Sequence, residues 1–325
     1  MIMNIKLDIK DKRILYELEK NARQSNKGIA KKLGLNVDLV RYRINNLEKE
    51  GLIAWHLTFV NFSKLGYTDY GVYFNTHNLT KNKEAFLIEY LSKHNKISYF
   101  ARLGGKYDFM FGLLATDILD FENLLSGILN QIGQYISNRD IAIRVALFHF
   151  PKSYLIDTKE IIGKMPSFGG KIEKIELDEI DKKIIKEMSI NARININDLS
   201  NKIKVPASTI SLRLKKLQKN KIIEGFFTFI RPQIYGYQNN LITISFNNLS
   251  RENENIFYGF CKQHPNVVYL IKTVGKWDYE LSVEFPDQER FQELLSELRE
   301  KFHASISNME FVTIFKDIKY SLYPF

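Results

Sequence analysis

Basic and hydroxyl side chains at helical spacing are the residues of this sequence that point most directly to a chemical role. Between Pro206 and Ile223, the apolar residues Ile210, Leu214 and Leu217 recur at the spacing of one stripe along an α-helix. The other faces carry hydroxyl groups first and cations afterwards, at Ser208, Thr209, Ser211, Lys215, Lys216 and Lys219. That order suits a helix whose first turns contact base edges in a major groove while its flank attracts phosphates. A solvated lysine face on a surface helix is the second interpretation of the same run.

An internal duplication places this helix in a larger unit. A shift of 170 residues aligns the sequence with itself without a gap, so that Asn21-Ala22-Arg23 falls on Asn191-Ala192-Arg193. Each copy is 149 residues long, at 7–155 and 177–325. The intervening segment 156–176 contains several glycines and a proline, which favours a linker or long turn with one short helix.

Helix-capping residues divide the start of copy 1 into three helices. Asp8 can cap a first helix, and Ser25 can cap a second that ends at Gly34. Asn36 can cap a third helix, which is predicted to end at Gly51. Three short helices with a tight turn before the third are typical of a helix-turn-helix, and the β-rich segment that follows is predicted to be the wing strand.

Copy 2 repeats these signals with one departure at the end of the third helix. This helix starts at Pro206, a residue that is well tolerated in a first turn. Lys221 stands where copy 1 has Gly51. Asn220 is therefore predicted to take the left-handed conformation, since asparagine tolerates it better than most residues.

A different periodicity follows in both copies. In copy 1 the predicted strands lie near 69–76, 97–103, 107–115 and 139–149 and the predicted helices near 80–94 and 117–132, with the equivalents 170 residues later in copy 2. The order βαββαβ is that of a ferredoxin-like unit, with four antiparallel strands and two helices on one face. The predicted fold class is α+β, two repeats of a winged helix-turn-helix followed by a ferredoxin-like βαββαβ domain. The predicted domains are 1–62, 63–155, 177–232 and 233–325, with a linker at 156–176.

The sheet face opposite the helices is predicted to be apolar. We assign to it the aromatic and β-branched or aliphatic residues Tyr73, Tyr99, Phe109, Phe111, Ile244, Phe246, Tyr269 and Leu281. A large apolar face needs cover. We therefore expect the two ferredoxin-like domains of one chain to pack on each other.

The distribution of charge limits the kinds of partner. Of the net charge of +10, segment 7–62 carries +4 and segment 177–232 carries +6, so a polyanion would meet two short segments. The single cysteine, Cys261, excludes an internal disulfide and a multi-thiolate zinc site and fits a reducing cytoplasm. The sequence has neither a secretion signal at its start nor an apolar run long enough to span a membrane, so we expect a cytoplasmic protein.

The sequence resembles the Lrp/AsnC family of transcription regulators, also called feast/famine regulators. The resemblance rests on LDIKDKRIL with NAR at 7–23, RINNLEKEGLI at 43–53 and GGKYD at 104–108, and on their equivalents in copy 2, which include VGKWD at 274–278. It implies a winged helix-turn-helix that binds double-stranded DNA and a ferredoxin-like domain that self-associates and often binds a small effector, typically an amino acid. It implies no cofactor and no enzymatic activity. Because family members usually carry one copy and dimerise, one chain here is similar to a covalent dimer.

Two sets of site residues follow. The predicted DNA-binding residues are Arg41, Tyr42, Asn45 and Asn46 in copy 1 and Ser208, Thr209, Ser211, Lys215, Lys216 and Lys219 in copy 2. The predicted effector-binding residues are Gly105, Asp108, Thr273, Gly275 and Asp278, because the resemblance places the effector near this loop. Gly105 and Gly275 also suit a positive φ in a tight turn, where Asp108 and Asp278 can accept backbone N–H groups.

Other repeated residues have structural as well as functional interpretations. Asn21-Ala22-Arg23 and its repeat favour packing and capping over DNA contact. Arg43 and Arg213 lie beside the buried stripe, where they can brace the helix or touch phosphate. His94 and its repeat His264 are expected at a helix end, since they lack further ligands at metal-binding spacing.

Two other functional classes stay open. Siroheme decarboxylases resemble this architecture, but they use histidine after the first ferredoxin-like helix, where this chain reads ISYFARLGGKYD and VVYLIKTVGKWD. A metabolite-sensing interaction module with degenerate DNA binding is more credible for copy 1. The stretch from Asp38 to Gly51 has no net charge, whereas that from Ser208 to Lys221 carries +5.

Overall fold

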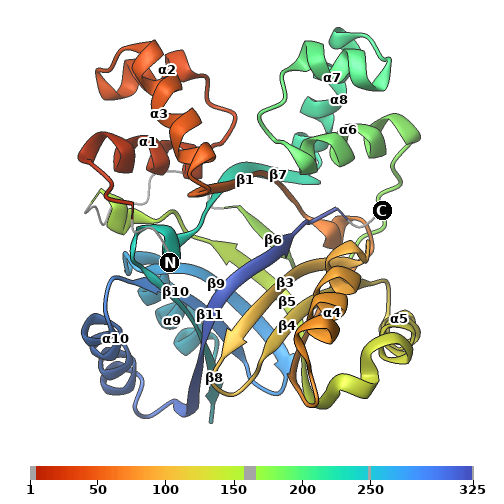
Figure 1. Cartoon of the computed structure of the whole chain (residues 1–325), viewed down its shortest axis with the longest axis vertical. Helices are drawn as coiled ribbons and strands as arrows, with labels where there is room; N and C mark the ends of the chain where they lie inside the picture. Colours follow the sequence, from red (N-terminus) through yellow and green to blue (C-terminus); the bar gives the residue numbers. More distant parts are fainter. Residues whose placement is uncertain (1–4, 157–165, 248–249, 324–325) are drawn as a thin grey trace.

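The computed structural model describes residues 5–156, 166–247 and 250–323 and arranges them in two layers. Two helical lobes lie on one side of a two-stranded ribbon, and a β-barrel with helices on its outer surface lies on the other side (Figure 1). Each sequence copy contributes one lobe, one ribbon strand and half of the barrel. Every helix in the described ranges is too short or too polar to span a bilayer.

Each lobe consists of three helices, and the strand that follows joins the ribbon. Copy 1 contributes α1 (Ile9–Lys20), α2 (Asn26–Leu33), α3 (Val37–Lys49) and β1 (Ile53–Val60), and copy 2 contributes α6 (Glu179–Ile190), α7 (Ile196–Ile203), α8 (Ala207–Lys219) and β7 (Ile223–Ile230). The predicted caps are confirmed, since Asp8, Ser25 and Asn36 each accept a backbone N–H of the helix that follows. Asp178 and Asn195 do the same in copy 2. Each bond satisfies an N–H that has no partner inside its helix.

The end of α8 differs from the prediction. Asn220 keeps a φ of −80°, and Lys221 takes the left-handed conformation with a φ of 55°. Lys221 is the equivalent of Gly51, whose φ is 75°. The turn into β7 repeats the turn into β1 and needs a positive φ at this position whichever residue occupies it. A side chain in that conformation costs about 1–2 kcal/mol, a cost that glycine avoids.

The ribbon joins the two lobes into one folded unit. β1 and β7 pair antiparallel, with Ile53 opposite Ile230 and Val60 opposite Ile223. α1 packs on β7 and α6 packs on β1, so each lobe rests on the strand of the other copy. The core of the first lobe accordingly includes Ile230, and that of the second includes Phe59.

The barrel consists of two ferredoxin-like units. Copy 1 forms β2 (Thr68–Thr76), α4 (Lys81–Lys93), β3 (Ile97–Gly104), β4 (Phe109–Ala115), α5 (Ile118–Ile132) and β5 (Ile136–His149). Copy 2 forms β8 (Gln238–Phe246), α9 (Arg251–Gln263), β9 (Val267–Gly275), β10 (Tyr279–Phe285), α10 (Gln288–Lys301) and β11 (Ile306–Tyr320). Short 3₁₀ turns η1 (Phe62–Lys64), η2 (Gly133–Tyr135), η3 (Ser153–Leu155) and η4 (Pro232–Tyr235) lie between elements. The strand orders are β3-β4-β2-β5 and β9-β10-β8-β11.

The two sheets also join at their edges. β5 pairs antiparallel with β9, and β3 pairs antiparallel with β11, so eight strands among the described residues close into a barrel. Inside, the rings of Tyr73 and Trp277 meet edge to face with centroids 4.9 Å apart. The expected packing of the two ferredoxin-like domains within one chain is therefore present, through strand pairing as well as through faces.

The predicted residues of the inner face were partly wrong. Tyr73, Tyr99 and Tyr269 lie inside the barrel. Five others pack under the outer helices, namely Phe109, Phe111, Ile244, Phe246 and Leu281. Side chains of a strand alternate between faces, but these strands are apolar on both sides, so the sequence pattern does not show which set faces inward.

The segment between the copies is only partly described, so the expected short helix is not tested where it falls on 157–165. Residues 157–165 lie outside the described ranges. Residues 166–176 hold no helix, and β6 (Ser167–Gly169) pairs with β5. Phe168 is buried against Phe62, with ring centroids 4.2 Å apart. This part of the segment is thus fixed to the barrel by an apolar side chain.

Candidate functional site

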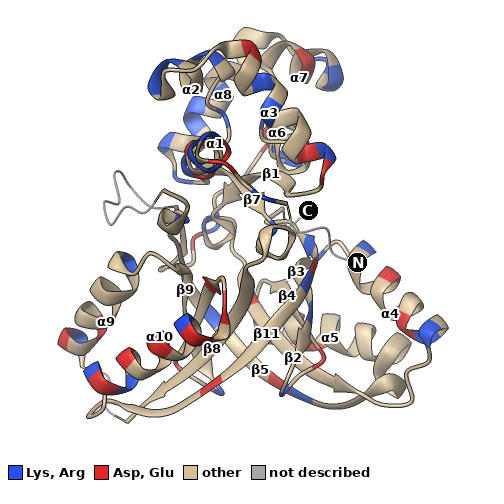
Figure 2. Cartoon of the chain, turned by 60° about the vertical axis from the view of Figure 1, so that its left-hand side comes forward, with Lys and Arg blue, Asp and Glu red and all other residues tan. Residues whose placement is uncertain are grey.

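Basic residues lie along α8, in the lobes above the ribbon (Figure 2). Most of the predicted DNA-binding side chains of this helix are exposed. The exposed ones are Ser208, Lys215, Lys216 and Lys219, and Thr209 is half-buried. Ser211 is also half-buried, and its hydroxyl donates to the backbone oxygen of Ala207 at 2.9 Å. Because a hydroxyl has a single hydrogen, Ser211 retains only acceptor capacity toward another molecule.

α3 presents a weaker positive charge. Arg41, Tyr42 and Asn45 are exposed, and Asn46 is half-buried. Arg41 forms an ion pair with Asp38 on the same surface. Both side chains are well exposed, so the pair is weak and Arg41 can exchange its partner. Asp38 nevertheless places a negative charge where α8 has Ser208.

One exposed apolar residue of α8, Leu212, was missed in the sequence, although its equivalent Tyr42 was predicted to bind DNA. Leu212 of α8 is 68% exposed, and its equivalent on α3, Tyr42, is 64% exposed. An apolar side chain on such a helix can contact the methyl group of thymine. The 170-residue shift, which places Leu212 on Tyr42, was the signal that could have identified it.

Arg43 and Arg213 brace their lobes. Arg43 Nη1 lies 2.7 Å from carboxylate oxygens of both Asp8 and Asp11. Arg213 pairs in the same way with Asp178 and Asp181. Each arginine thus ties the third helix of its lobe to the start of the first.

The Asn-Ala-Arg turns contact each other. Arg23 Nη1 donates to the backbone oxygen of Ile194 at 2.9 Å, and Arg193 Nη1 donates to that of Ala22 at 2.6 Å. Arg193 Nη2 also donates to Asn26 Oδ1 at 2.8 Å. Burial lowers the pKa of both guanidinium groups. The structural interpretation of this motif therefore describes it better, and the partner of each arginine is the other copy.

The predicted effector residues make internal hydrogen bonds. Asp108 accepts the backbone N–H of Thr76 at 2.8 Å, and Asp278 accepts that of Phe246 at 2.7 Å. The Thr273 hydroxyl donates to the backbone oxygen of residue 277 at 2.6 Å. Gly105 and Gly275 have the expected positive φ, at 105° and 128°.

The two predicted effector loops lie toward the same part of the barrel interior. The rings of Tyr107 and Trp277, one from each loop, have centroids 6.5 Å apart. A Cβ on Gly275 would lie 3.0 Å from the backbone oxygen of Ile141, so this loop touches the last strand of the other copy. The loops thus lie where the two halves of the barrel contact each other.

A cavity of about 70 Å³ lies where the barrel meets β7. Its wall includes Phe229 of β7 and a buried triad in which Arg144 contacts Glu280 at 2.9 Å and Asp69 at 3.1 Å. Asp317 also lines the cavity, and its Oδ1 accepts from the Tyr99 hydroxyl at 2.6 Å. Its Oδ2 has no hydrogen-bond partner in the described part of the chain.

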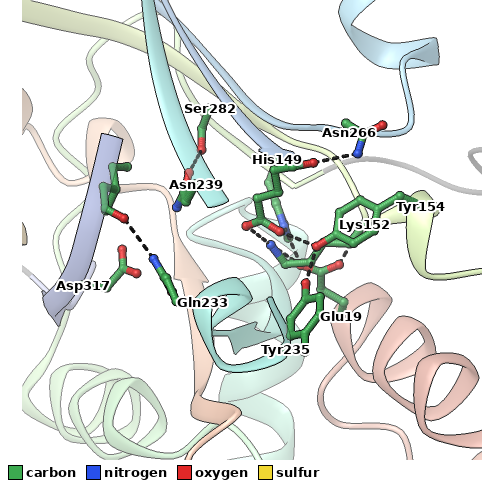
Figure 3. Close-up of polar contacts among 12 residues, drawn as sticks. Glu19, His149, Lys152, Tyr154, Gln233, Tyr235, Asn239, Asn266, Ser282 and Asp317 are labelled. Atoms are coloured by element: carbon green, nitrogen blue, oxygen red, sulfur yellow. Dashed lines mark hydrogen bonds and ion pairs between the residues drawn. The ribbon is translucent and has the colours of Figure 1, made fainter. Parts of the chain in front are cut away.

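A second buried network joins the first lobe to the barrel (Figure 3). Glu19 of α1 accepts the backbone N–H of Lys152 at 2.6 Å, and His149 Nε2 lies 3.6 Å from Glu19. Lys152 pairs with Glu284, which also accepts from the Tyr154 hydroxyl. Burial raises the pKa of Glu284. The network ties the orientation of α1 to β10 of the other copy.

These buried polar residues were missed in the sequence, although a signal was present. Glu280, Ser282 and Glu284 alternate along β10 and therefore share one face. Their equivalents in copy 1 are Met110, Gly112 and Leu114. Carboxylates at positions where the other copy is apolar or small mark a difference between two otherwise matching interiors.

The repeated histidines end helices, as expected. His94 and His264 are the C-cap residues of α4 and α9. In the described ranges, no group of three or more His, Cys, Asp or Glu is arranged to hold a metal ion. Cys261 is buried in α9, and burial raises the pKa of its thiol.

Sequence comparisons match both lobes. Residues 7–54 match a family described as winged helix-turn-helix DNA-binding, and residues 177–218 match the AsnC-type helix-turn-helix domain. Transcriptional regulator AzlB of Bacillus subtilis is 30% identical over 142 residues, which are 43% of this chain and 90% of that protein. HTH-type transcriptional regulator FL11 of Pyrococcus horikoshii is 26% identical over 125 residues, which are 38% of this chain and 80% of that protein.

A solved structure matches the whole arrangement. The siroheme decarboxylase NirDL aligns with 98% of this chain and 94% of its own, with a TM-score of 0.62 and 11% sequence identity. At this identity the similarity concerns the fold. The arrangement of two lobes above one barrel is therefore shared with a protein that is named as an enzyme.

Proposed function

Because the chain belongs to the Lrp/AsnC family of DNA-binding transcription regulators, we propose that it binds two half-sites of one double-stranded DNA operator through α3 and α8. The observation that carries this proposal is the fixed pairing of the two lobes. The β1–β7 ribbon and the reciprocal bonds of Arg23 and Arg193 hold them together, and both lobes point away from the barrel (Figure 1). Two helices held at one separation fit half-sites spaced by about one helical turn or a multiple of it.

The two helices contribute unequally in this proposal. α8 attracts phosphates with Lys215, Lys216 and Lys219, whereas Asp38 offsets Arg41 on α3. A carboxylate repels phosphate and can only accept hydrogen bonds from bases. The operator is therefore expected to have two dissimilar half-sites, with copy 2 supplying most of the affinity.

A small effector, such as an amino acid, is proposed near Gly105 to Asp108 or Gly275 to Asp278. Support comes from the resemblance and from the contact of these loops with the other copy, which lets a bound molecule alter the fit of the halves. Calorimetry with a panel of amino acids on wild type and Asp278→Ala tests it. If the substitution leaves amino-acid binding unchanged, the effector site lies elsewhere in the protein.

We also propose that the protein acts in the cytoplasm and that chains associate with one another through their ferredoxin-like domains.

The decisive experiment is footprinting on genomic DNA followed by fluorescence anisotropy on the recovered operator and on each half-site alone. Asp38→Ser is expected to strengthen binding by roughly fivefold, since about 1 kcal/mol of repulsion is removed. Ser208→Asp is the matched reverse change and should weaken it. A protein that binds recovered and scrambled DNA equally at physiological salt would contradict sequence-specific recognition.

The whole-chain similarity to NirDL favours one second candidate, a tetrapyrrole decarboxylase. Histidine is missing from residues 97–108 and 267–278, and the interior cavity is lined by carboxylates, which repel the carboxylate groups of uroporphyrin-type molecules. Addition of an iron uroporphyrin while recording the visible spectrum separates the candidates. A saturable one-to-one spectral change would favour the enzyme, and an unchanged spectrum favours the regulator.

A further inference from the structure

The wall of the cavity beneath β7 contains more buried carboxylates than the adjacent cationic side chains neutralise. Asp69 and Glu280 share one cation, Arg144, which is itself buried. In the described ranges, Asp317 forms no ion pair, although it is only 3% exposed. Its Oδ1 accepts from the Tyr99 hydroxyl, and its Oδ2 has no hydrogen-bond partner among the described residues.

Packing does not account for this carboxylate. The equivalent of Asp317 in copy 1 is Leu147, which lines the same cavity. A buried charge without a partner costs several kcal/mol, whereas leucine at this place would add stability. A group that destabilises the interior at one position, beside a cavity, is a candidate for ligand binding.

The cavity lies on the pseudo-twofold axis that relates the two copies. Both members of several equivalent pairs line it, namely Asp69 and Asn239, Tyr99 and Tyr269, Met110 and Glu280, Arg144 and Ile314, and Leu147 and Asp317. The chain therefore has one such cavity in its described part, at the opposite end of β3 and β9 from the predicted effector loops. None of the predicted effector residues lines the cavity, but Trp277 of one loop donates to Glu280 of the cavity wall at 3.2 Å.

We propose that this cavity binds one small organic cation, a primary ammonium with a short alkyl chain, whose nitrogen donates to Asp317 Oδ2. This ligand site goes beyond DNA binding. Its influence on the lobes, described below, rests on the proposed function.

The wall of the cavity matches this class of ligand. Its volume of about 70 Å³ is room for roughly five water-sized groups. The rings of Tyr99, Tyr269 and Tyr320 surround it, and aromatic faces attract organic cations. Leu241 and Ile271 supply apolar surface for an alkyl chain.

The charges exclude two neighbouring classes of ligand. A zwitterionic amino acid would need a cation for its carboxylate, but Arg144 is already engaged by Asp69, Glu280 and the Tyr73 hydroxyl. A divalent metal ion would need several converging ligands, and the described ranges contain no cluster of three or more His, Cys, Asp or Glu suited to one.

The position of the cavity connects it to the DNA-binding layer. Phe229 of β7 lines it, and the Phe229 ring packs edge to face on Tyr320 with centroids 5.5 Å apart. Tyr320 also contacts Phe227 of the same strand at 5.9 Å. A molecule bound between Asp317 and these rings would contact side chains that pack on the β1–β7 ribbon. The ribbon sets the distance between the two lobes, so the bound molecule could change that distance.

Calorimetry of the full chain with ethylammonium chloride tests the site, with sodium chloride at equal ionic strength as the reference. Saturable binding of one ethylammonium per chain is expected for wild type. Asp317→Asn removes the charge and keeps the shape, so affinity should fall by at least about tenfold. Asp317→Leu, which copies position 147, should abolish binding. Glu293→Gln, which removes an exposed carboxylate from α10, is the matched control and should change nothing.

Three outcomes would overturn the site: no heat beyond that of sodium chloride, equal affinity in Asp317→Asn, or stronger binding of glycine than of ethylammonium. If both Asp317 variants fail to fold, the wild-type protein is tested instead. Nuclear Overhauser contacts between labelled ethylammonium and the Met110 methyl group would support the site, and their absence would refute it. Anisotropy with the operator, without amine, separates this inference from the proposed function. If the protein binds DNA but does not bind ethylammonium, the cation site is refuted and the proposed DNA-binding function is not.

Discussion

Arg23 and Arg193 each donate to the backbone of the other's Asn-Ala-Arg turn, at 2.5 Å to Ala192 O and 2.6 Å to Ala22 O. The two side chains are equivalent in the two copies, so the contact is reciprocal. It resembles the self-complementary contact at the twofold axis of a dimer. A sequence motif found in both copies thus acts between the copies.

Arg23→Ala should weaken this connection. The substitution leaves the carbonyl oxygens of Ala192 and Ile194 without their donor, which costs about 1–3 kcal/mol of unfolding free energy. The ribbon and the Arg193 bonds then hold the lobes alone and less firmly, so affinity for the two-half-site operator should fall by up to about tenfold, while affinity for one half-site stays unchanged. Arg193→Ala should act alike, and Lys31→Ala on the exposed side of α2 is the control. Equal losses on single and double sites would contradict the role of the contact in spacing.

The salt dependence of DNA binding should reveal the division of work between the helices. Replacing Lys215 and Lys216 by alanine should weaken binding to all sequences and lower the slope of log K against log salt by about 0.9 for each phosphate that the variant no longer neutralises. Replacing Arg41 and Lys49 should have a smaller effect, since the charge of Asp38 offsets that of Arg41. The measurement is one salt titration for each double variant on one operator. A larger effect of the copy 1 variant would show that local helix charge does not decide the division.

Lys221→Gly should stabilise the protein. The residue holds a φ of 55°, a conformation that costs a side chain about 1 kcal/mol and that Gly51 adopts freely. Chemical denaturation should show a gain of up to about that size. Lys219→Gly, two residues earlier in the last turn of α8, is the control and should destabilise by about 1 kcal/mol. A loss of stability in both variants would mean that the turn tolerates lysine without strain.

The stability of the ligand-free protein should fall with rising pH through Asp317. Burial raises the pKa of this carboxyl, against the opposing hydrogen bond from Tyr99 and the charges of Lys152 and Arg231. The native state then holds a proton that the unfolded chain releases near about pH 3.9. The contribution to the unfolding free energy is complete below that pH and is lost as the pH rises through the native pKa, by at most about 1.4 kcal/mol per unit. Asp317→Asn should lack this slope, and parallel curves for the two proteins would show that the native pKa is not raised.

Local features of the fold were predictable from sequence because their causes are local. Asp8, Ser25 and Asn36 cap the helices that immediately follow them, and the strand and helix order of each ferredoxin-like unit follows from periodicity within it. The exposed basic residues of α8 follow from the same helical spacing. The predicted DNA-binding and effector roles themselves stay predictions.

Features that depend on contacts between the copies were not predictable in the same way. The pairing of β5 with β9 and the bond from Arg23 to Ile194 join residues far apart in the chain, and no spacing within one copy indicates them. The positive φ of Lys221 is imposed by the path into β7, against the preference of the residue. In the sequence, Asp317 is one of the polar residues of an alternating strand and is expected to face solvent. Only the closed barrel shows that it is buried.

The position of the cavity on the axis separates this chain from an assembly of identical subunits. In a homodimer an axial cavity receives every side chain twice, so a carboxylate there would face its own copy and repel it at short range. Fusion of the two halves removes that constraint, because the residues at positions 317 and 147 can differ, as Asp317 and Leu147 do. A site for a single positive charge at the centre of the molecule is therefore open to the fused chain and closed to a symmetric pair.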